Sequence, residues 1–186
     1  GTPNAAYENL LDVDNLIDYM LVIFFTGNKD APISNFLGNG SPNNFFAVRN
    51  RTGLYGGFRF MAHDSEHTLL IGDLSIDRTG PYAAGDPVQQ GASTGFIKSS
   101  PGYVFTRLSA NAEFRLRVAD HIQKHFFNGG VLTTESCRAR FLTRSNELYS
   151  PMVAESARWG DSKVEPPRMR NTDWVAEVNR VYTNWF

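Results

Sequence analysis

The chain has 186 residues, of which 41% are hydrophobic and 20% are charged, and its formal net charge is −1. These values are those of an ordinary globular protein, long enough to bury a core, and they exclude intrinsic disorder. The near-zero net charge gives no electrostatic basis for binding nucleic acid or an anionic membrane surface.

The cysteine count and the apolar runs exclude further classes. The single cysteine, Cys137, rules out an internal disulfide and any site with several cysteine ligands. It lies in a helical pattern, which predicts a buried structural thiol rather than a nucleophile. The most apolar run, residues 19–26, is far too short for a membrane span. No signal peptide or initiator Met opens the chain, so we expect a piece of a longer protein whose compartment the sequence leaves open.

The first predicted helix covers residues 10–24, where apolar side chains form a broad face. Asp12 or Asp14 is its expected cap, and Gly27 with Asn28 supplies its stop. The last two turns are apolar almost all round. This pattern predicts a central, buried position for the helix.

A hairpin is predicted next. The composition of residues 29–42 predicts a loop. Residues 44–50 and 58–62 are predicted to form two strands, and residues 52–57 are predicted to form the turn between them. Residues 72–102 are rich in Gly, Pro, Ser and Asp, and a loop of that length is usually functional or mobile.

Three helices are predicted after this loop, at residues 103–127, 133–158 and 171–186. Thr133 or Thr134 ahead of Glu135 is a partial capping signal, and Asn171 or Thr172 is the expected cap of the last helix. The fold class is therefore α+β and mainly helical, in a single domain over residues 1–186.

Two acids and one amide are the candidate site residues. Asp30 stands in a polar loop after the buried helix, where it is suited to act as a base or to bind a cation. Asn44, beside Asn43, opens the first strand, and an amide oxygen is a hard ligand suited to Mg²⁺. Asp64 directly follows the second strand, where a sheet fixes a carboxylate and the loop leaves it open. Asn35 is a rival to Asn44.

The acid and imidazole cluster around Asp64 leaves a second interpretation open. Continued strand geometry would put Asp64 and Glu66 on one face and His63 and His67 on the other. These four residues suit a transition metal and allow a metal-dependent hydrolase, although their spacing does not match HExxH.

Other catalytic motifs are absent from the sequence. It contains no Walker A sequence, no GxGxxG and no GxSxG. Asp77 and Arg78, in the long loop, are expected to pair with each other rather than to bind a substrate.

Four strings resemble the spore-coat protein H (CotH) kinases, a bacterial family of atypical protein kinases. They are VDNLIDYM at residues 13–20, GNKD at 27–30, NNFFAVRN at 43–50, and FRF at 58–60 leading into HDSEHT at 63–68. The late segment 115–130, with HFFNGG at 125–130, is also similar to larger bacterial members. The resemblance covers most of the chain.

The resemblance implies a kinase-like C-terminal lobe. Asp30 would be the catalytic-loop aspartate that positions the acceptor hydroxyl, and Asn44 and Asp64 would bind Mg²⁺ or Mn²⁺. Glu66, His63 and His67 would take supporting positions. ATP would be the co-substrate, and the acceptors would be Ser or Thr hydroxyls of a protein. The family also implies a secreted or cell-surface parent.

The sequence departs from the kinase pattern in two places. The segment from Asp30 to Asn44 is longer than the usual spacing, which keeps Asn35 as an alternative metal ligand. The residues before Asp12 are too few for a nucleotide-binding N-terminal lobe, so we expect this piece alone not to transfer phosphate. A pseudokinase or a structural spore-coat-like module is the non-enzymatic alternative.

Overall fold

The computed structural model describes residues 10–31, 44–52, 56–79 and 100–186. Within these ranges the protein is α+β and mainly helical, with one two-stranded antiparallel sheet, as predicted. The chain forms two compact units, Gly1–His121 and Ile122–Phe186, which are described separately below. A single domain over the whole chain stays a prediction.

Helix α2 (Val13–Thr26) is the central element of the first unit. Asp12 caps it by accepting a hydrogen bond from the Asn15 amide at 2.9 Å. The helix ends where Gly27 adopts φ 60°, a left-handed conformation that costs glycine little. Both ends therefore follow from local sequence rules, and both were predicted.

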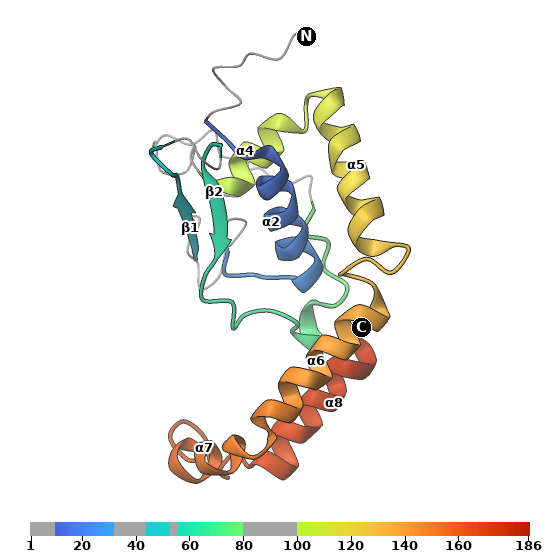
Figure 1. Cartoon of the computed structure of the whole chain (residues 1–186). Coiled ribbons are helices and arrows are strands. Elements are labelled where there is room, and N and C mark those ends of the chain that lie inside the picture. Colours follow the sequence, from blue (N-terminus) through green and yellow to red (C-terminus); the bar gives the residue numbers. More distant parts are fainter. Residues whose placement is uncertain (1–9, 32–43, 53–55, 80–99) are drawn as a thin grey trace. The chain divides into compact units, whose positions relative to one another are not determined.

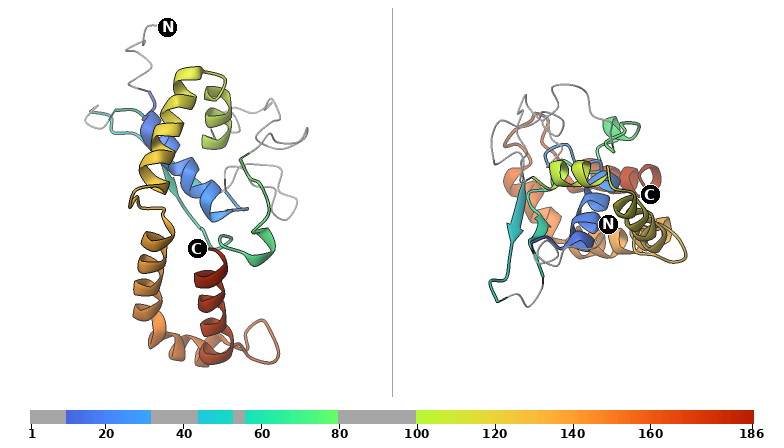
Figure 2. Two further views of the ribbon diagram at one scale, coloured as in Figure 1. Left: turned by 90° about the vertical axis from the view of Figure 1, so that its right-hand side faces the viewer. Right: turned by 90° about the horizontal axis from the view of Figure 1, so that it is seen from above.

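Packing on two sides buries α2. Figure 1 and the view from above in Figure 2 show the helix beside the hairpin, with α4 (Pro101–Leu108) passing across it. Phe24 meets Phe105 of α4 with ring centroids 5.6 Å apart. The predicted buried position is confirmed. The buried core cluster consists of Leu16, Tyr19, Met20, Ile23, Ala31 and Phe60.

The hairpin pairs β1 (Phe45–Val48) with β2 (Arg59–Ala62) in antiparallel register, with Phe45 opposite Ala62. Just before β2, Phe58 exchanges backbone hydrogen bonds with the residues that lead into α2. A Cβ on Gly57 would lie 2.0 Å from the Leu11 nitrogen, so only glycine allows this approach. The hairpin is thereby fixed to the start of the helix.

Asn15 connects α2 to β2 through its side chain. Its Oδ1 accepts from the Phe60 amide at 2.5 Å, and its Nδ2 donates to the Phe60 carbonyl at 3.2 Å. One side-chain amide thus satisfies both backbone polar groups of a buried strand residue.

The region after the hairpin differs from the prediction. Residues 80–99 of the predicted long loop lie outside the described residues, while Ile71–Asp73 forms the short 3₁₀ helix η2.

The predicted helix over 103–127 is wrong as one element, because it divides into α4 and α5 (Ala112–Phe126). The break follows from Asn111, whose Oδ1 accepts from the Glu113 and Phe114 amides and starts a new helix.

Within the first unit, charged side chains link α2 to the beginning of α5. Arg117 makes a bidentate interaction with Asp14, in which two guanidinium nitrogens donate to the two carboxylate oxygens at 2.6 and 2.8 Å. The hydrogen bond from Arg117 holds the pKa of the Asp14 carboxyl below its ordinary value. The His121 ring lies 2.6 Å from Asp18 and 3.0 Å from Asp14. Two acids one turn apart on α2 thus face two bases one turn apart on α5.

In the second unit, α6 (Thr134–Tyr149) lies beside α8 (Val175–Asn184), as Figure 2 shows. The predicted single helix over 133–158 is wrong, because Pro151 ends it and begins α7 (Pro151–Trp159). Proline lacks the N–H that the helix interior needs but suits a first turn. The predicted cap at Thr133 is confirmed, since its hydroxyl accepts from the Ser136 amide.

The last predicted helix, 171–186, begins with the π-helical turn η3 (Arg170–Trp174), which continues into α8. Neither Asn171 nor Thr172 caps it. Instead, Asp173 accepts from the Met169 amide at 2.8 Å, which holds the pKa of this carboxyl below its ordinary value. No helix in the described part of the chain has the length and apolar content to cross a membrane.

The Asn15 bridge predicts a measurable loss of stability. Asn15→Ala leaves the Phe60 N–H and C=O without their partner, and we expect it to lower the free energy of unfolding by about 2 kcal/mol. Chemical denaturation measures this loss. Asn179→Ala, at an exposed helical position, is the control and should change the stability by less than about 0.5 kcal/mol. Equal effects of the two substitutions would contradict the role of the bridge.

Candidate active site

Asp30 lies four residues beyond the end of α2, and the structure buries it to 6% exposure. Asn28, which is 1% exposed, accepts from the Asp30 amide through Oδ1 at 2.9 Å. The backbone N–H of Asn28 in turn donates to the backbone carbonyl of Ile23 in the helix. The carboxylate is therefore positioned by the end of a buried helix.

Asn44 contacts Asp30 directly. Its Nδ2 donates to Asp30 Oδ2 at 3.1 Å and to the backbone carbonyl of Asp64 at 3.3 Å. A carboxylate and a carbonyl only accept hydrogen bonds, so the amide nitrogen must face both of them. The amide oxygen then points to the other side of the group, where it is placed to accept a donor or to bind a cation.

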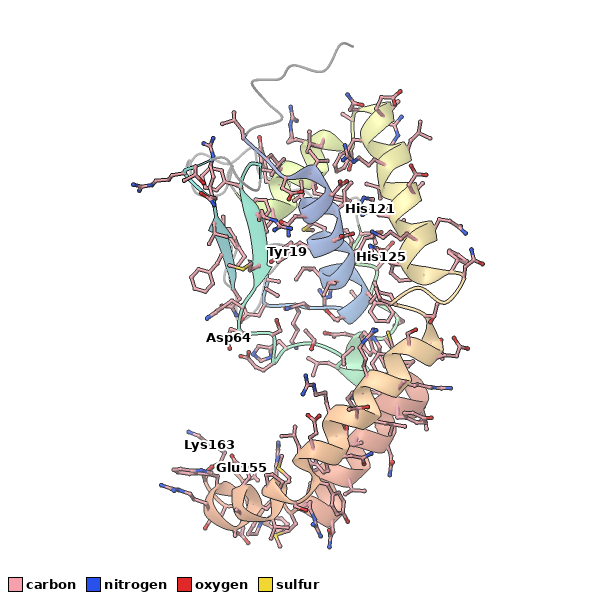
Figure 3. All side chains as sticks on the ribbon, in the orientation of Figure 1. Tyr19, Asp64, His121, His125, Glu155 and Lys163 are labelled. Carbon is pink, nitrogen blue, oxygen red and sulfur yellow. The ribbon has the colours of Figure 1, made fainter. Side chains whose placement is uncertain are left out.

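Asp64 joins this arrangement through its backbone. It follows β2, as Figure 3 shows, and its side chain is exposed. Asp64 and Asn44 have φ values of 49° and 48°, a left-handed conformation that asparagine and aspartate tolerate better than most residues. Both therefore turn the chain at the same end of the hairpin. The structure thus brings the side chains of Asp30 and Asn44 together with the backbone of Asp64.

The left-handed turn at Asp64 also changes the geometry expected for the next residues. Continued strand geometry would place Glu66 and His67 on opposite faces, yet one ligand atom of each lies within 4.8 Å of the other and of a carboxylate oxygen of Asp30. His67 Nε2 lies 3.5 Å from Glu66 Oε1. The predicted alternation of faces is wrong here, because Asp64 leaves the extended conformation.

Backbone hydrogen bonds hold this segment against the end of α2. The Lys29 amide donates to the His67 carbonyl at 3.3 Å, and the Leu69 amide donates to the Thr26 carbonyl at 2.9 Å. The segment that carries Glu66 and His67 is therefore held in place next to the loop that carries Asp30.

His63 has a different environment. Its ring packs edge-on against Phe46, with centroids 4.7 Å apart. It is not a member of the group formed by Asp30, Glu66 and His67. Asn35 and Asn43 lie outside the described residues. Of the two amides predicted as alternative metal ligands, Asn35 and Asn44, the structure therefore describes Asn44, and it lies beside Asp30.

The expected ion pair between Asp77 and Arg78 is wrong. Arg78 instead pairs with Asp73 at 3.0 Å. The Asp77 carboxylate accepts from the amide and hydroxyl of Thr79, and these bonds hold its pKa below the ordinary value. Both acids have structural roles in the chain after the hairpin.

Tyr19 belongs to the core rather than to the site. Its ring packs on Phe60 at a centroid distance of 6.0 Å (Figure 3). Burial raises the pKa of the Tyr19 hydroxyl far above its ordinary value, and no described residue hydrogen-bonds to that hydroxyl. Tyr19 therefore stays neutral. Cys137 of the second unit is buried, as predicted, and burial raises the pKa of its thiol.

The second unit contains a cavity that was not predicted. It has a volume of about 830 Å³ and lies among α7, η3 and α8. Trp159 and Trp174 line it together with the oppositely charged Glu155 and Lys163, which Figure 3 labels. All three tryptophans of the chain lie in its last thirty residues, and this clustering was the available signal. The charges of both signs give the cavity no preference for an anion or a cation.

No protein-family model, curated protein or solved structure matches this chain.

The contact between Asn44 and Asp30 predicts a specific loss of stability. Asn44→Gly keeps the left-handed backbone accessible but removes the donor to a buried carboxylate, and we expect unfolding free energy to fall by about 2 kcal/mol. Asn128→Gly is a matched control, because Asn128 is exposed and has φ 52°. A chemical denaturation curve for Asn44→Gly no different from that for Asn128→Gly would contradict the contact.

Proposed function

We propose that this chain is the metal-binding and acceptor-positioning lobe of a CotH-like protein kinase. The observation that carries the proposal is the Asn44 amide, which donates to both the Asp30 carboxylate and the Asp64 carbonyl. Phosphoryl transfer depends mainly on positioning and on charge neutralisation, so it needs these groups at fixed separations.

Asp30 is assigned the acceptor end of the site. The oxygen of a Ser or Thr hydroxyl attacks the γ-phosphorus of ATP, forming a new O–P bond while the bond to the ADP oxygen breaks. The hydroxyl proton passes to the Asp30 carboxylate. Asp30 is suited to this role because Asn28 and Asn44 orient it through hydrogen bonds.

Asn44 and Asp64 are the residues that would hold Mg²⁺ or Mn²⁺. An amide oxygen and a carboxylate are the hard donors that these ions prefer, and the nitrogen of Asn44 is already occupied by two acceptors. The exposed Asp64 side chain is accessible to the phosphates of a bound nucleotide. The metal would supply neutralisation of the phosphate charge.

Phosphate transfer tests the proposal. The full-length gene product, incubated with labelled ATP and Mg²⁺, should phosphorylate hydroxyl groups of a general protein substrate or of itself. Asp30→Asn and Asp64→Asn should each reduce the rate by about 10²- to 10⁴-fold. Asp77→Asn is the control, because this acid binds only Thr79 among the contacts above, and it should keep the wild-type rate.

Two results would contradict the proposal. The first is a transfer rate that Asp30→Asn or Asp64→Asn leaves unchanged. The second is the absence of any ATP-dependent transfer by a full-length protein whose circular dichroism shows that it is folded.

A further inference from the structure

The group formed by Asp30, Glu66 and His67 has a composition different from that of the proposed magnesium site. We propose that these three residues bind a divalent transition-metal ion of the Zn²⁺ or Mn²⁺ class. The site shares Asp30 with the proposed kinase function, but it does not depend on that function and is tested without phosphate transfer.

The distances agree with coordination. Ligand atoms at about 2.1 Å from a tetrahedral zinc ion lie roughly 3.4 Å from one another. His67 Nε2 and Glu66 Oε1 are 3.5 Å apart, which is longer than the usual N–H···O hydrogen bond of about 2.9 Å. All three ligand atoms lie within 4.8 Å of one another.

The donor types favour a transition metal. Mg²⁺ prefers oxygen ligands, whereas an imidazole nitrogen suits Zn²⁺ and its neighbours in the first transition row. One imidazole with two carboxylates gives three protein ligands. A three-ligand zinc site keeps a fourth position for water or a substrate, as catalytic zinc sites do.

The surrounding structure holds the ligands in place before any ion binds. Asp30 is buried, and Asn44 donates a hydrogen bond to its carboxylate, which is the usual arrangement around a ligating carboxylate. The His67 backbone is tied to Lys29, next to Asp30. The His67 side chain is 27% exposed and that of Glu66 is 55% exposed, so an ion can enter from solvent.

Calorimetric titration of the 186-residue chain with Zn²⁺ in magnesium-free buffer tests the site. We expect one zinc ion that depends on His67, with His67→Ala weakening its binding by about 100-fold, at least the effect of losing an outer-shell partner. Glu66→Gln should weaken it by about tenfold or more. His63→Ala is the matched control. His63 lies four residues before His67, and its imidazole packs on Phe46, so this substitution should leave zinc binding unchanged.

Three results would overturn the proposal: no zinc binding by the wild type, unchanged affinity in both His67→Ala and Glu66→Gln, or an equal loss in His63→Ala. Circular dichroism establishes whether each variant is folded. If His67→Ala does not fold, Glu66→Gln, at an exposed position, tests the zinc site instead. Asp64→Asn separates this inference from the proposed function, because it should abolish Mg²⁺ binding and retain Zn²⁺ binding.

Discussion

The side-chain amide of Asn44 is the interaction on which the candidate site depends. It joins the loop after α2 to the loop after β2, two segments more than thirty residues apart in the chain, by donating to Asp30 and to Asp64. Because both partners accept hydrogen bonds, only an amide nitrogen satisfies them without bringing a further charge next to a buried carboxylate. Aspartate in this position would add a second negative charge, and an aliphatic residue would remove the hydrogen bond that Asn44 donates to Asp30.

This contact is possible because α2 and the hairpin form one packed body. Asn15 binds both backbone polar groups of Phe60, and Gly57 allows the hairpin to approach the start of the helix. The same helix ends at Gly27, and the loop that follows places Asp30 beside Asn44 at one end of the hairpin. The buried helix thus serves the site by fixing the position of its aspartate, which agrees with the proposed role of a catalytic loop.

Local rules accounted for most elements, and the errors have local causes. The cap at Asp12, the stop at Gly27 and the two strands follow from residue type. The helix breaks at Asn111 and Pro151 could also have been read from the sequence, since one is a cap residue and the other a proline within a helical pattern. The apolar periodicity continues across both breaks, and the prediction of two unbroken helices rests on that periodicity rather than on Asn111 and Pro151.

The site was predictable only in part. Position and the family resemblance predict Asp30, Asn44 and Asp64 as site residues, and the Asn44 amide joins the Asp30 carboxylate to the Asp64 backbone. That Glu66 and His67 both approach Asp30 depends on the left-handed conformation of Asp64 and on backbone bonds to the end of α2. Such long-range contacts leave no pattern in a single sequence, whereas strand alternation does and misled here.

The role assigned to Asn44 is tested most directly by NMR of its side-chain amide during a Mg²⁺ titration. The account predicts that the ¹³Cγ resonances of Asn44 and Asp64 shift together and saturate together, while the ¹³Cγ of Asn50, whose oxygen is occupied by Thr52, stays unchanged. A titration in which Mg²⁺ binds the chain while Asn44 and Asp64 do not shift would contradict it.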